Sequence, residues 1–154
     1  ENITLGNKSI SREKVIQSAK KVGIHEFISQ LPNSYDFEVK ERGGVLSAGQ
    51  RQLISFLRAF VYDPQLLVLD EATSSIDTDS ELLIQKAIEK ITKNRTSIII
   101  AHRLSTIMKA DKIIVMDKGK IVEVGKHQEL LKNVQGVYYN LYQAQLKKEN
   151  ELVV

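Results

Sequence analysis

The sequence contains no cysteine, which excludes a disulfide framework and a thiolate metal site and is compatible with a reducing compartment. Long apolar runs are also missing. The longest, Leu66–Leu69 and Ile98–Ala101, fall far below the roughly 18 residues that a membrane-spanning helix needs. The N-terminus has no basic-then-apolar signal pattern. We therefore expect any membrane-spanning part of the protein to lie outside this chain.

A strong charge of one sign is absent as well. The 22 Lys and Arg residues are interleaved with 19 acidic residues, and the resulting net charge of +3 argues little for nucleic-acid binding. Apolar residues at 42% and charged residues at 27% are ordinary for a soluble globular chain. A length of 154 residues suffices for one compact domain with its own core.

The first third of the chain is expected to be helical. Apolar residues recur at helical spacing over 11–22, where Ser11 is placed to cap a helix and Gly23 to end it, and a short helix follows at about 24–30. The stretch 31–45 holds turn-forming residues with little periodicity, so we predict a loop. Loops of this length in compact domains are usually functional or mobile, which makes this one a candidate contact surface.

Helices and strands alternate in the middle of the chain. A stripe of apolar residues predicts a helix from just after Ser47 to Asp63, and the run Leu66–Leu69 then predicts a strand buried on both faces. A second amphipathic helix is predicted over about 79–92, before another apolar strand at 97–101. Strand, helix and strand in this order indicate a parallel βαβ unit. The two helical stripes consist of Leu53, Phe56, Leu57, Phe60, Ile84, Ile88 and Ile91.

The last third is predicted to contain a hairpin. The apolar runs Ile113–Met116 and Ile121–Val124 flank a turn in which Gly119 suits a positive φ. We expect this hairpin to give the sheet an antiparallel edge, and helices at about 126–132 and 137–149 to close the chain. The predicted fold class is therefore α/β.

The run LLVLDEATSSID, Leu66–Asp77, ends a buried strand in two carboxylates, which is the Walker B arrangement of nucleotide hydrolases. In that arrangement Asp70 would orient Mg²⁺, usually through its water shell, and Glu71 would polarise the water that attacks the γ-phosphate of ATP. The alternative is an acidic N-terminus for the following helix, because strand ends followed by acids are common.

The run LSAGQRQ, Leu46–Gln52, lies where a loop becomes a helix. Ser47 and the backbone N–H groups after it would lie at the positive end of that helix, which attracts phosphate. The small residues Ala48 and Gly49 allow the backbone to approach an anion closely, and the Ser47 hydroxyl can donate one more hydrogen bond. The alternative is an ordinary serine N-cap.

A phosphate-binding loop of the form G-x-x-x-x-G-K-[ST] is missing. Gly44 and Gly49 have the spacing of its two glycines, but Gln50 and Arg51 stand where the lysine and the hydroxyl are needed. We therefore expect the groups that grip the β- and γ-phosphates to come from outside this chain.

His102 directly follows the apolar strand TSIIIA. At the carboxyl end of a parallel strand it would share a sheet edge with Asp70 and Glu71, where an imidazole could contact a γ-phosphate. A lone histidine after a strand is more often a solvated loop residue, so its significance depends on that shared geometry. His25 and His127 have no such setting, and we predict both to be ordinary helix-surface residues.

Taken in order, LSAGQRQ, LLVLDEATSSID and AHRLST resemble the signature, the Walker B motif with D-loop, and the switch histidine of ABC ATPases. The segment ENITLG is similar to the one after the family's Q-loop, and DKIIVMDKGKIVEVGKHQELL to its closing hairpin and helix. The stretch LPNSYDFEVKERG is similar to LPxGYDTxVGERG of ABC exporters, whose Glu-Arg-Gly part is the X-loop that meets transmembrane coupling helices. Ser34 and Lys40 replace the usual glycines, and Ala48 departs from the commoner LSGGQ.

The resemblance implies part of a P-loop NTPase core at 63–154 and the ABC helical subdomain at 1–62. It also implies a head-to-tail dimer of nucleotide-binding domains, in which each ATP lies between the Walker A loop of one domain and the signature helix of the other. By position, Glu71 and His102 would serve hydrolysis of the chain's own ATP, and Asp77 the D-loop contact across the interface. The partner's ATP would meet Ser47, Ala48, Gly49 and Gln50. The coupling helices would meet Glu38, Val39, Lys40, Glu41, Arg42 and Gly43.

The same resemblance places the base-stacking aromatic, the Walker A lysine and the Q-loop glutamine before residue 1. We expect the isolated chain to bind ATP weakly and to hydrolyse it negligibly. For the apolar sheet edge left exposed we predict self-association, strand exchange or a partner chain that covers it. The intact protein is expected to use ATP and Mg²⁺ to drive export at the cytoplasmic face of a membrane.

Two other functions stay open. An ABC ATPase acting on nucleic acid or ribosomes would show tight, salt-dependent DNA binding, and the exporter-like EVKERG argues against it. A non-catalytic interaction module would account for the missing phosphate loop, but the presence of Glu71 and His102 argues against lost hydrolysis.

Overall fold

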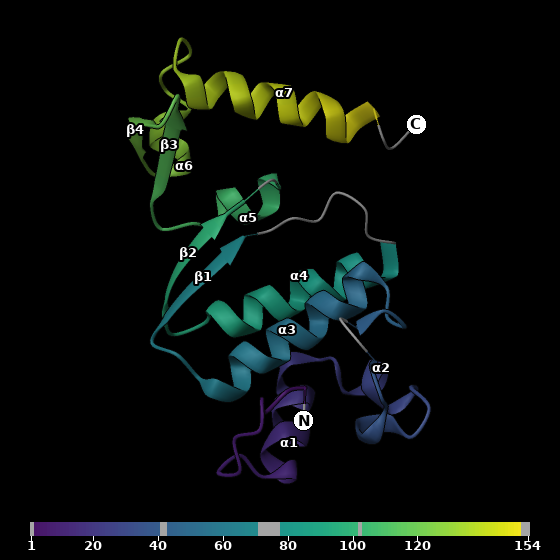
Figure 1. Cartoon of the computed structure of the whole chain (residues 1–154). Coiled ribbons are helices and arrows are strands. Elements are labelled where there is room, and N and C mark those ends of the chain that lie inside the picture. The colour runs from purple at the N-terminus through teal and green to yellow at the C-terminus, as the bar shows by residue number, and fades with distance from the viewer. Residues whose placement is uncertain (1, 41–42, 71–77, 102, 152–154) are drawn as a thin grey trace. The chain divides into compact units, whose positions relative to one another are not determined.

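The computed structural model describes residues 2–40, 43–70, 78–101 and 103–151 (Figure 1). Glu71, Asp77 and His102, together with Glu41 and Arg42 of the predicted contact loop, lie outside the described residues. The chain divides into two compact units, one built from residues up to 98 and one from residue 99 onward, with Asp70 counted in the second. Each unit is described by itself.

The first unit begins with two helices whose ends follow the local sequence. Helix α1 (Arg12–Val22) begins at Ser11, whose hydroxyl accepts a hydrogen bond from the Lys14 N–H at 3.2 Å. It ends at Gly23, whose φ of 91° lies in the left-handed region that glycine tolerates. Helix α2 (His25–Ser29) follows. The helices predicted for 11–22 and 24–30 are therefore confirmed.

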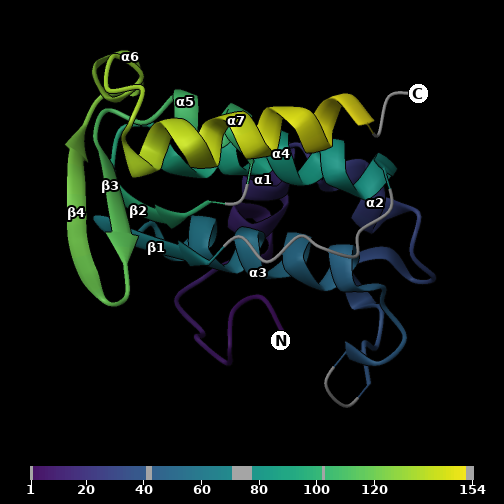
Figure 2. The ribbon, with the colours of Figure 1, turned by 90° about the horizontal axis from the view of Figure 1, so that it is seen from above.

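Two longer helices, α3 (Ala48–Tyr62) and α4 (Thr78–Thr92), form the centre of the first unit and run side by side (Figures 1 and 2). Their predicted stripes are buried, except that Phe60 is half-buried. The largest side chains with no more than 1% exposure in this unit are Val22, Ile24, Leu53, Leu57, Val61, Ile84 and Ile91. Burial of this apolar surface is the main force that holds the helices together.

Strands β1 (Leu66–Asp70) and β2 (Thr96–Ile100) are neighbours in a two-stranded sheet and run in the same direction (Figure 1). The predicted parallel βαβ unit is therefore confirmed. The prediction that β1 is buried on both faces is wrong for the described residues, because its side chains alternate between buried and exposed. The uncovered face of the sheet is apolar and consists of Leu66, Val68, Ile98 and Ile100, each more than half exposed.

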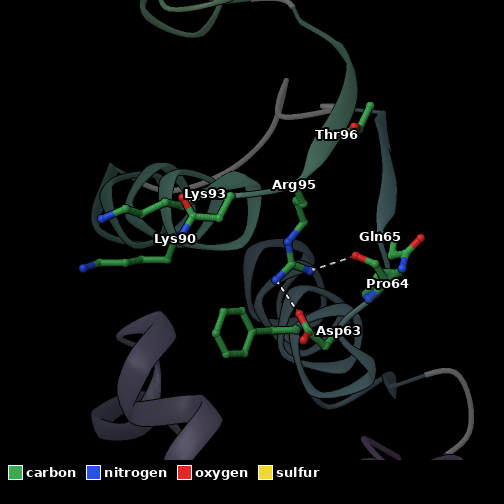
Figure 3. Close-up of a pocket in the computed structure, with 9 residues that line it drawn as sticks. Asp63, Pro64, Gln65, Lys90, Lys93, Arg95 and Thr96 are labelled. Carbon is green, nitrogen blue, oxygen red and sulfur yellow. Dashed lines mark hydrogen bonds and ion pairs between the residues drawn. The ribbon is translucent and has the colours of Figure 1, made fainter.

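Arg95 joins the turn that follows α3 to the turn that precedes β2 (Figure 3). Its guanidinium donates to an Asp63 carboxylate oxygen at 2.8 Å and to the Pro64 carbonyl at 3.4 Å, and it lies over the Phe60 ring at 5.8 Å from the centroid. The Arg95 side chain is only 10% exposed. Its planar fork can stack and bridge two acceptors at once, which a lysine ammonium is not shaped to do.

The substitution Arg95→Lys should therefore lower the free energy of unfolding by about 1–3 kcal/mol, although it keeps the charge. Chemical denaturation of the chain measures this. Lys90→Arg is the matched control, because Lys90 extends away from Arg95 (Figure 3), and it should change stability by less than about 0.5 kcal/mol. Equal stability of the two variants would contradict a stabilising role for the Arg95 contacts with Asp63 and Pro64.

The second unit contains the hairpin of β3 (Ile113–Asp117) and β4 (Lys120–Gly125), whose strands run in opposite directions (Figure 2). Lys118 and Gly119 both have positive φ, 47° and 76°, which is the pattern of a type I′ turn. The hairpin is confirmed, but its place as an antiparallel edge of the β1–β2 sheet is not. Within the described residues β3 and β4 form a separate sheet. One face of that sheet packs on helices of its own unit.

Three helices complete the second unit: α5 (Leu104–Met108), α6 (His127–Leu130) and α7 (Val137–Glu151). Its core consists of Ile113, Val115, Leu130 and Tyr138. Glu123 of β4 accepts a hydrogen bond from the backbone N–H of Tyr138 at 2.7 Å, so a carboxylate from another element caps the first turn of α7. Helix α5 has no counterpart among the sequence predictions.

The prediction that His25 and His127 are ordinary helix-surface residues is wrong. The Nδ1 atom of His127 lies 2.7 Å from the Tyr138 hydroxyl, and that of His25 lies 2.9 Å from the Tyr35 hydroxyl. Both histidines are half-buried. Each imidazole therefore tethers a segment that is remote in sequence, an interaction that helical spacing does not reveal.

Candidate functional site

The N-terminus of α3 is built by a reciprocal pair of hydrogen bonds. The Ser47 Oγ accepts from the Gln50 N–H at 3.2 Å, and the Gln50 Oε1 accepts from the Ser47 N–H at 3.0 Å. This capping box fixes where the helix begins. The serine is therefore an N-cap, as the alternative interpretation held.

Capping leaves donors available at this helix end. A hydroxyl that accepts through its oxygen keeps its own proton, and an amide that accepts through Oε1 keeps both hydrogens of its NH₂ group. The N–H groups of Ala48 and Gly49 occupy the first two helical positions, which have no intrahelical acceptor. Ser47 and Ala48 are exposed, whereas Gln50 is half-buried and Gly49 is buried, so solvent reaches the outer donors of this helix end. The geometry is compatible with both a cap and an anion site.

The charge in the first turn of α3 distinguishes it from the other capped helices. Helix α1 carries Glu13 in its first turn, and α6 carries Glu129, so a carboxylate offsets the positive end of each. The pKa of Glu13 is lowered by hydrogen bonds from its own backbone N–H and from Ser11. The first turn of α3 contains no acid and includes Arg51. Its positive end is therefore left for an external anion.

Asp70 is the last residue of β1 and is exposed. A carboxylate at the carboxyl end of a parallel strand suits Mg²⁺, which prefers oxygen ligands and keeps several of its waters. The Asp70 carboxylate is therefore suited to hold Mg²⁺ through the waters of the ion. Glu71, Asp77 and His102 fall outside the described residues, so their predicted place beside Asp70 stays a prediction.

The predicted contact loop is anchored at its start. A 3₁₀ turn, η1 (Ser34–Asp36), interrupts it. Asp36 forms a two-pronged ion pair with Arg12 of α1, with both N–O distances at 2.7 Å. The Arg12 guanidinium lowers the pKa of the exposed Asp36 carboxyl, so this anchor persists at neutral pH and is lost as the pH falls through that lowered value. Beyond the anchor, Phe37 and Val39 are half-buried while Glu38 and Lys40 are exposed.

Two residues of this loop hold a glycine-like backbone. Ser34 has a φ of 53° and Lys40 a φ of 52°, both in the left-handed region. These are the positions at which the exporter pattern LPxGYDTxVGERG carries glycine. The loop therefore keeps the backbone shape that the glycines would allow, at a cost of about 1–2 kcal/mol for each non-glycine residue.

Lys40→Gly should accordingly raise the free energy of unfolding by about 0.5–1 kcal/mol, since relief of the strain exceeds the extra entropy of an unfolded glycine. Lys40→Ala is the control, because it removes the side chain and keeps the penalty on φ. Thermal denaturation of the three chains measures the difference. A glycine variant that is less stable than the alanine variant would show that the loop is not strained here.

Arg51 is a residue that the sequence analysis did not assign to the site. Its Nη1 donates to the Leu46 carbonyl at 2.5 Å, so the side chain reaches back over the N-cap. A Cβ added to Gly43, whose φ is 68°, would lie 3.1 Å from Arg51 Cδ. The helical spacing from Ser47 to Arg51 was the signal, because side chains on a helix lean toward its N-terminus.

A depression of about 620 Å³ lies at the amino ends of β1 and β2 and includes Asp63, Lys90, Lys93 and Arg95 in its lining (Figure 3). Asp70 ends β1 at the opposite end of that strand. Lys90 and Lys93 extend away from Arg95, and Arg95 pairs with Asp63 (Figure 3). Two of the charged lining residues, Asp63 and Arg95, are therefore explained by their ion pair with each other.

Comparisons with known proteins indicate the family to which this α/β chain is similar. The family model described as ABC transporter matches residues 1–74. The leukotoxin export ATP-binding protein of Aggregatibacter actinomycetemcomitans is 54% identical over 146 residues, covering 95% of this chain and 21% of that protein. The alpha-hemolysin translocation ATP-binding protein HlyB of Escherichia coli O6:H1 is 54% identical over 145 residues, covering 94% and 20%.

A solved structure has the same fold. A bacterial Atm1-family ABC exporter with ATP bound matches 94% of this chain and 25% of its own, with a TM-score of 0.80 and 42% identity. The chain belongs to the ABC transporter family, and its relatives include ATP-binding proteins of exporters. It spans between a fifth and a quarter of the length of the relatives named here. No helix among the described residues is long and apolar enough to cross a membrane.

Proposed function

We propose that this chain supplies the signature helix and the Walker B strand of the ATP-driven motor of an ABC exporter. The observation that supports this most directly is the end of α3, where a capping box fixes the backbone while the Ser47 hydroxyl and the Gln50 amide keep hydrogens to donate. The absence of an acid from that first turn removes the charge that would repel a triphosphate. The ATP-binding names of the relatives point to the same chemistry.

Each site residue has a distinct role in this proposal. The donors of Ser47, Ala48, Gly49 and Gln50 contact the γ-phosphate of an ATP held by the Walker A loop of a second nucleotide-binding domain. Asp70 would hold Mg²⁺ through a bound water, and the ion would supply positive charge that offsets the charge of the phosphates. Glu71 polarises the attacking water, His102 contacts the γ-phosphate of the chain's own ATP, and Asp77 meets the partner domain. ATP and Mg²⁺ are thus shared between two domains.

The proposed partners follow from two parts of the first unit, the end of α3 and the contact loop, in which Glu38 and Lys40 are exposed. The end of α3 meets the second nucleotide-binding domain head to tail, and the loop from Glu38 to Gly43 meets the coupling helices of a transmembrane domain. The division into a helical subdomain at 1–62 and a half core at 63–154 and the location at the cytoplasmic face of a membrane belong to the same proposal. We also propose that the isolated chain self-associates, because the apolar face with Leu66 and Val68 is exposed.

The test is ATP hydrolysis by the exporter polypeptide that carries this segment, reconstituted in lipid vesicles. We expect hydrolysis that requires Mg²⁺, stops on chelation with EDTA, and traps nucleotide when vanadate is added. Absence of Mg²⁺-dependent hydrolysis would contradict the motor proposal. Tight DNA binding that weakens steeply with salt would instead favour an ABC ATPase acting on nucleic acid.

A further inference from the structure

We propose that Arg51 is a positioning residue that links the turn from Gly43 to Leu46, which follows the contact loop, with the phosphate-facing end of α3. Through this link, a displacement of the contact loop reaches Ser47, and closure of the helix end on ATP reaches the loop. This inference rests on the proposed function and adds to it the residue that carries the coupling.

The first support is a series of hydrogen bonds that leads from the loop to the helix. The Lys40 carbonyl accepts from the Gly43 N–H at 3.3 Å, and the Gly43 carbonyl accepts from the Leu46 N–H at 2.9 Å. The Leu46 carbonyl in turn accepts from Arg51 Nη1 at 2.5 Å. The Arg51 N–H donates to the Ser47 carbonyl at 3.0 Å, which closes the path on the N-cap.

The second support is packing, which is independent of the hydrogen bonds. The Cβ direction of Gly43 is occupied by the stem of Arg51, with Cδ at 3.1 Å and Cγ at 3.3 Å from an added Cβ. Leu46 is only 5% exposed, so the residue between the turn and the cap is held in the core. The guanidinium of Arg51 therefore holds Leu46, and its stem packs against Gly43.

The third support is electrostatic. A cation in the first turn lies at the positive end of the helix, where it disfavours helix formation. Arg51 is thus a poor choice for the stability of α3 taken alone. Its contacts with Gly43 and Leu46 give it a role outside the helix, which is to hold the neighbouring turn.

Arg58 provides the comparison that separates this role from ordinary support. It belongs to the same helix and also donates to a main-chain carbonyl, that of Asn2, through Nε at 3.1 Å and Nη2 at 2.9 Å. Residue type and acceptor type therefore match those of Arg51. The segment that Arg58 holds is the N-terminus and not the contact loop.

The experiment compares Arg51→Met with Arg58→Met in the exporter polypeptide that carries this segment, reconstituted in vesicles. The probe is ATP with Mg²⁺ and vanadate. Two quantities are measured: the amount of trapped nucleotide, and the change in hydrogen exchange that trapping causes at the backbone amides of residues 43–46. Methionine keeps a long apolar stem and removes all donors.

We expect Arg51→Met to trap nucleotide within about twofold of the wild type and to lose most of the loop response, with the exchange change reduced about fivefold or more. Arg58→Met should keep the loop response. Arg51→Lys, which keeps one donor group, should retain an intermediate response and covers the case in which the methionine variant folds poorly. A purely structural role would instead lower trapping and loop response in the same proportion.

The outcomes separate the two proposals. A wild type that traps no nucleotide overturns the motor function, and this inference with it. A wild type that traps nucleotide while Arg51→Met and Arg58→Met show the same loop response overturns the role of Arg51 alone. A lysine variant with no response beyond that of the methionine variant would also count against the hydrogen bond to Leu46.

Discussion

Ser47→Asp is expected to leave the folded chain about as stable as the wild type and to weaken ATP-dependent pairing of two nucleotide-binding domains by about 100-fold or more. Asp is as good an N-cap as Ser, so the hydrogen bond from the Gln50 N–H at 3.2 Å survives. In the proposed arrangement, however, the carboxylate would take the place of the hydroxyl donor and would face the γ-phosphate of the partner's ATP. Repulsion between a carboxylate and a phosphate in contact costs several kcal/mol of binding free energy where water is excluded.

The measurement has two parts, thermal denaturation of the chain and nucleotide-dependent pairing of the exporter domains by light scattering or cross-linking. Ser47→Thr is the control, because it keeps a capping hydroxyl and should preserve both properties. Ser47→Ala should lower stability by about 1 kcal/mol and weaken pairing less than the aspartate does. If Ser47→Asp pairs as well as the wild type, the serine is an ordinary helix cap.

Glu71→Gln should reduce the rate of ATP hydrolysis by about 10²–10⁴-fold, since the amide keeps the size of the carboxylate and loses its ability to polarise the attacking water. ATP binding should persist, so the variant should accumulate a stable ATP-bound pair of domains. Single-turnover hydrolysis with radiolabelled ATP, together with the amount of pair, measures both effects.

Asp70→Asn gives the contrast for this prediction. Asp70 is proposed to act through Mg²⁺, so its substitution should weaken the binding of Mg-ATP and should prevent accumulation of the pair. The roles of Asp70 and Glu71 would then be distinguished by the different effects of the two substitutions on ATP binding. Equal loss of ATP binding in both variants would show that Glu71 does not have the role of a general base.

Elements with local signals were predictable from the sequence. Ser11 and Gly23 set the ends of α1, and Ser47 set the start of α3, because capping bonds join residues three or four apart. The alternation of helix and strand likewise gave the parallel pair β1–β2. In the candidate site, the sequence identified the donors of α3 and the carboxylate of Asp70. The shared edge of Glu71 and His102 stays a prediction.

The sequence by itself determined where most of the helices and strands lie and which motifs stand at their tips, because these depend on neighbours along the chain, although it did not predict α5 or η1. Tertiary structure decided which face of β1 is covered, where the imidazole of His127 points, and that Arg51 reaches the Leu46 carbonyl. Such contacts depend on side-chain direction and on surfaces brought together from distant parts of the chain. Periodicity carries no information about such contacts, so the candidate link through Arg51 depends on the tertiary structure alone.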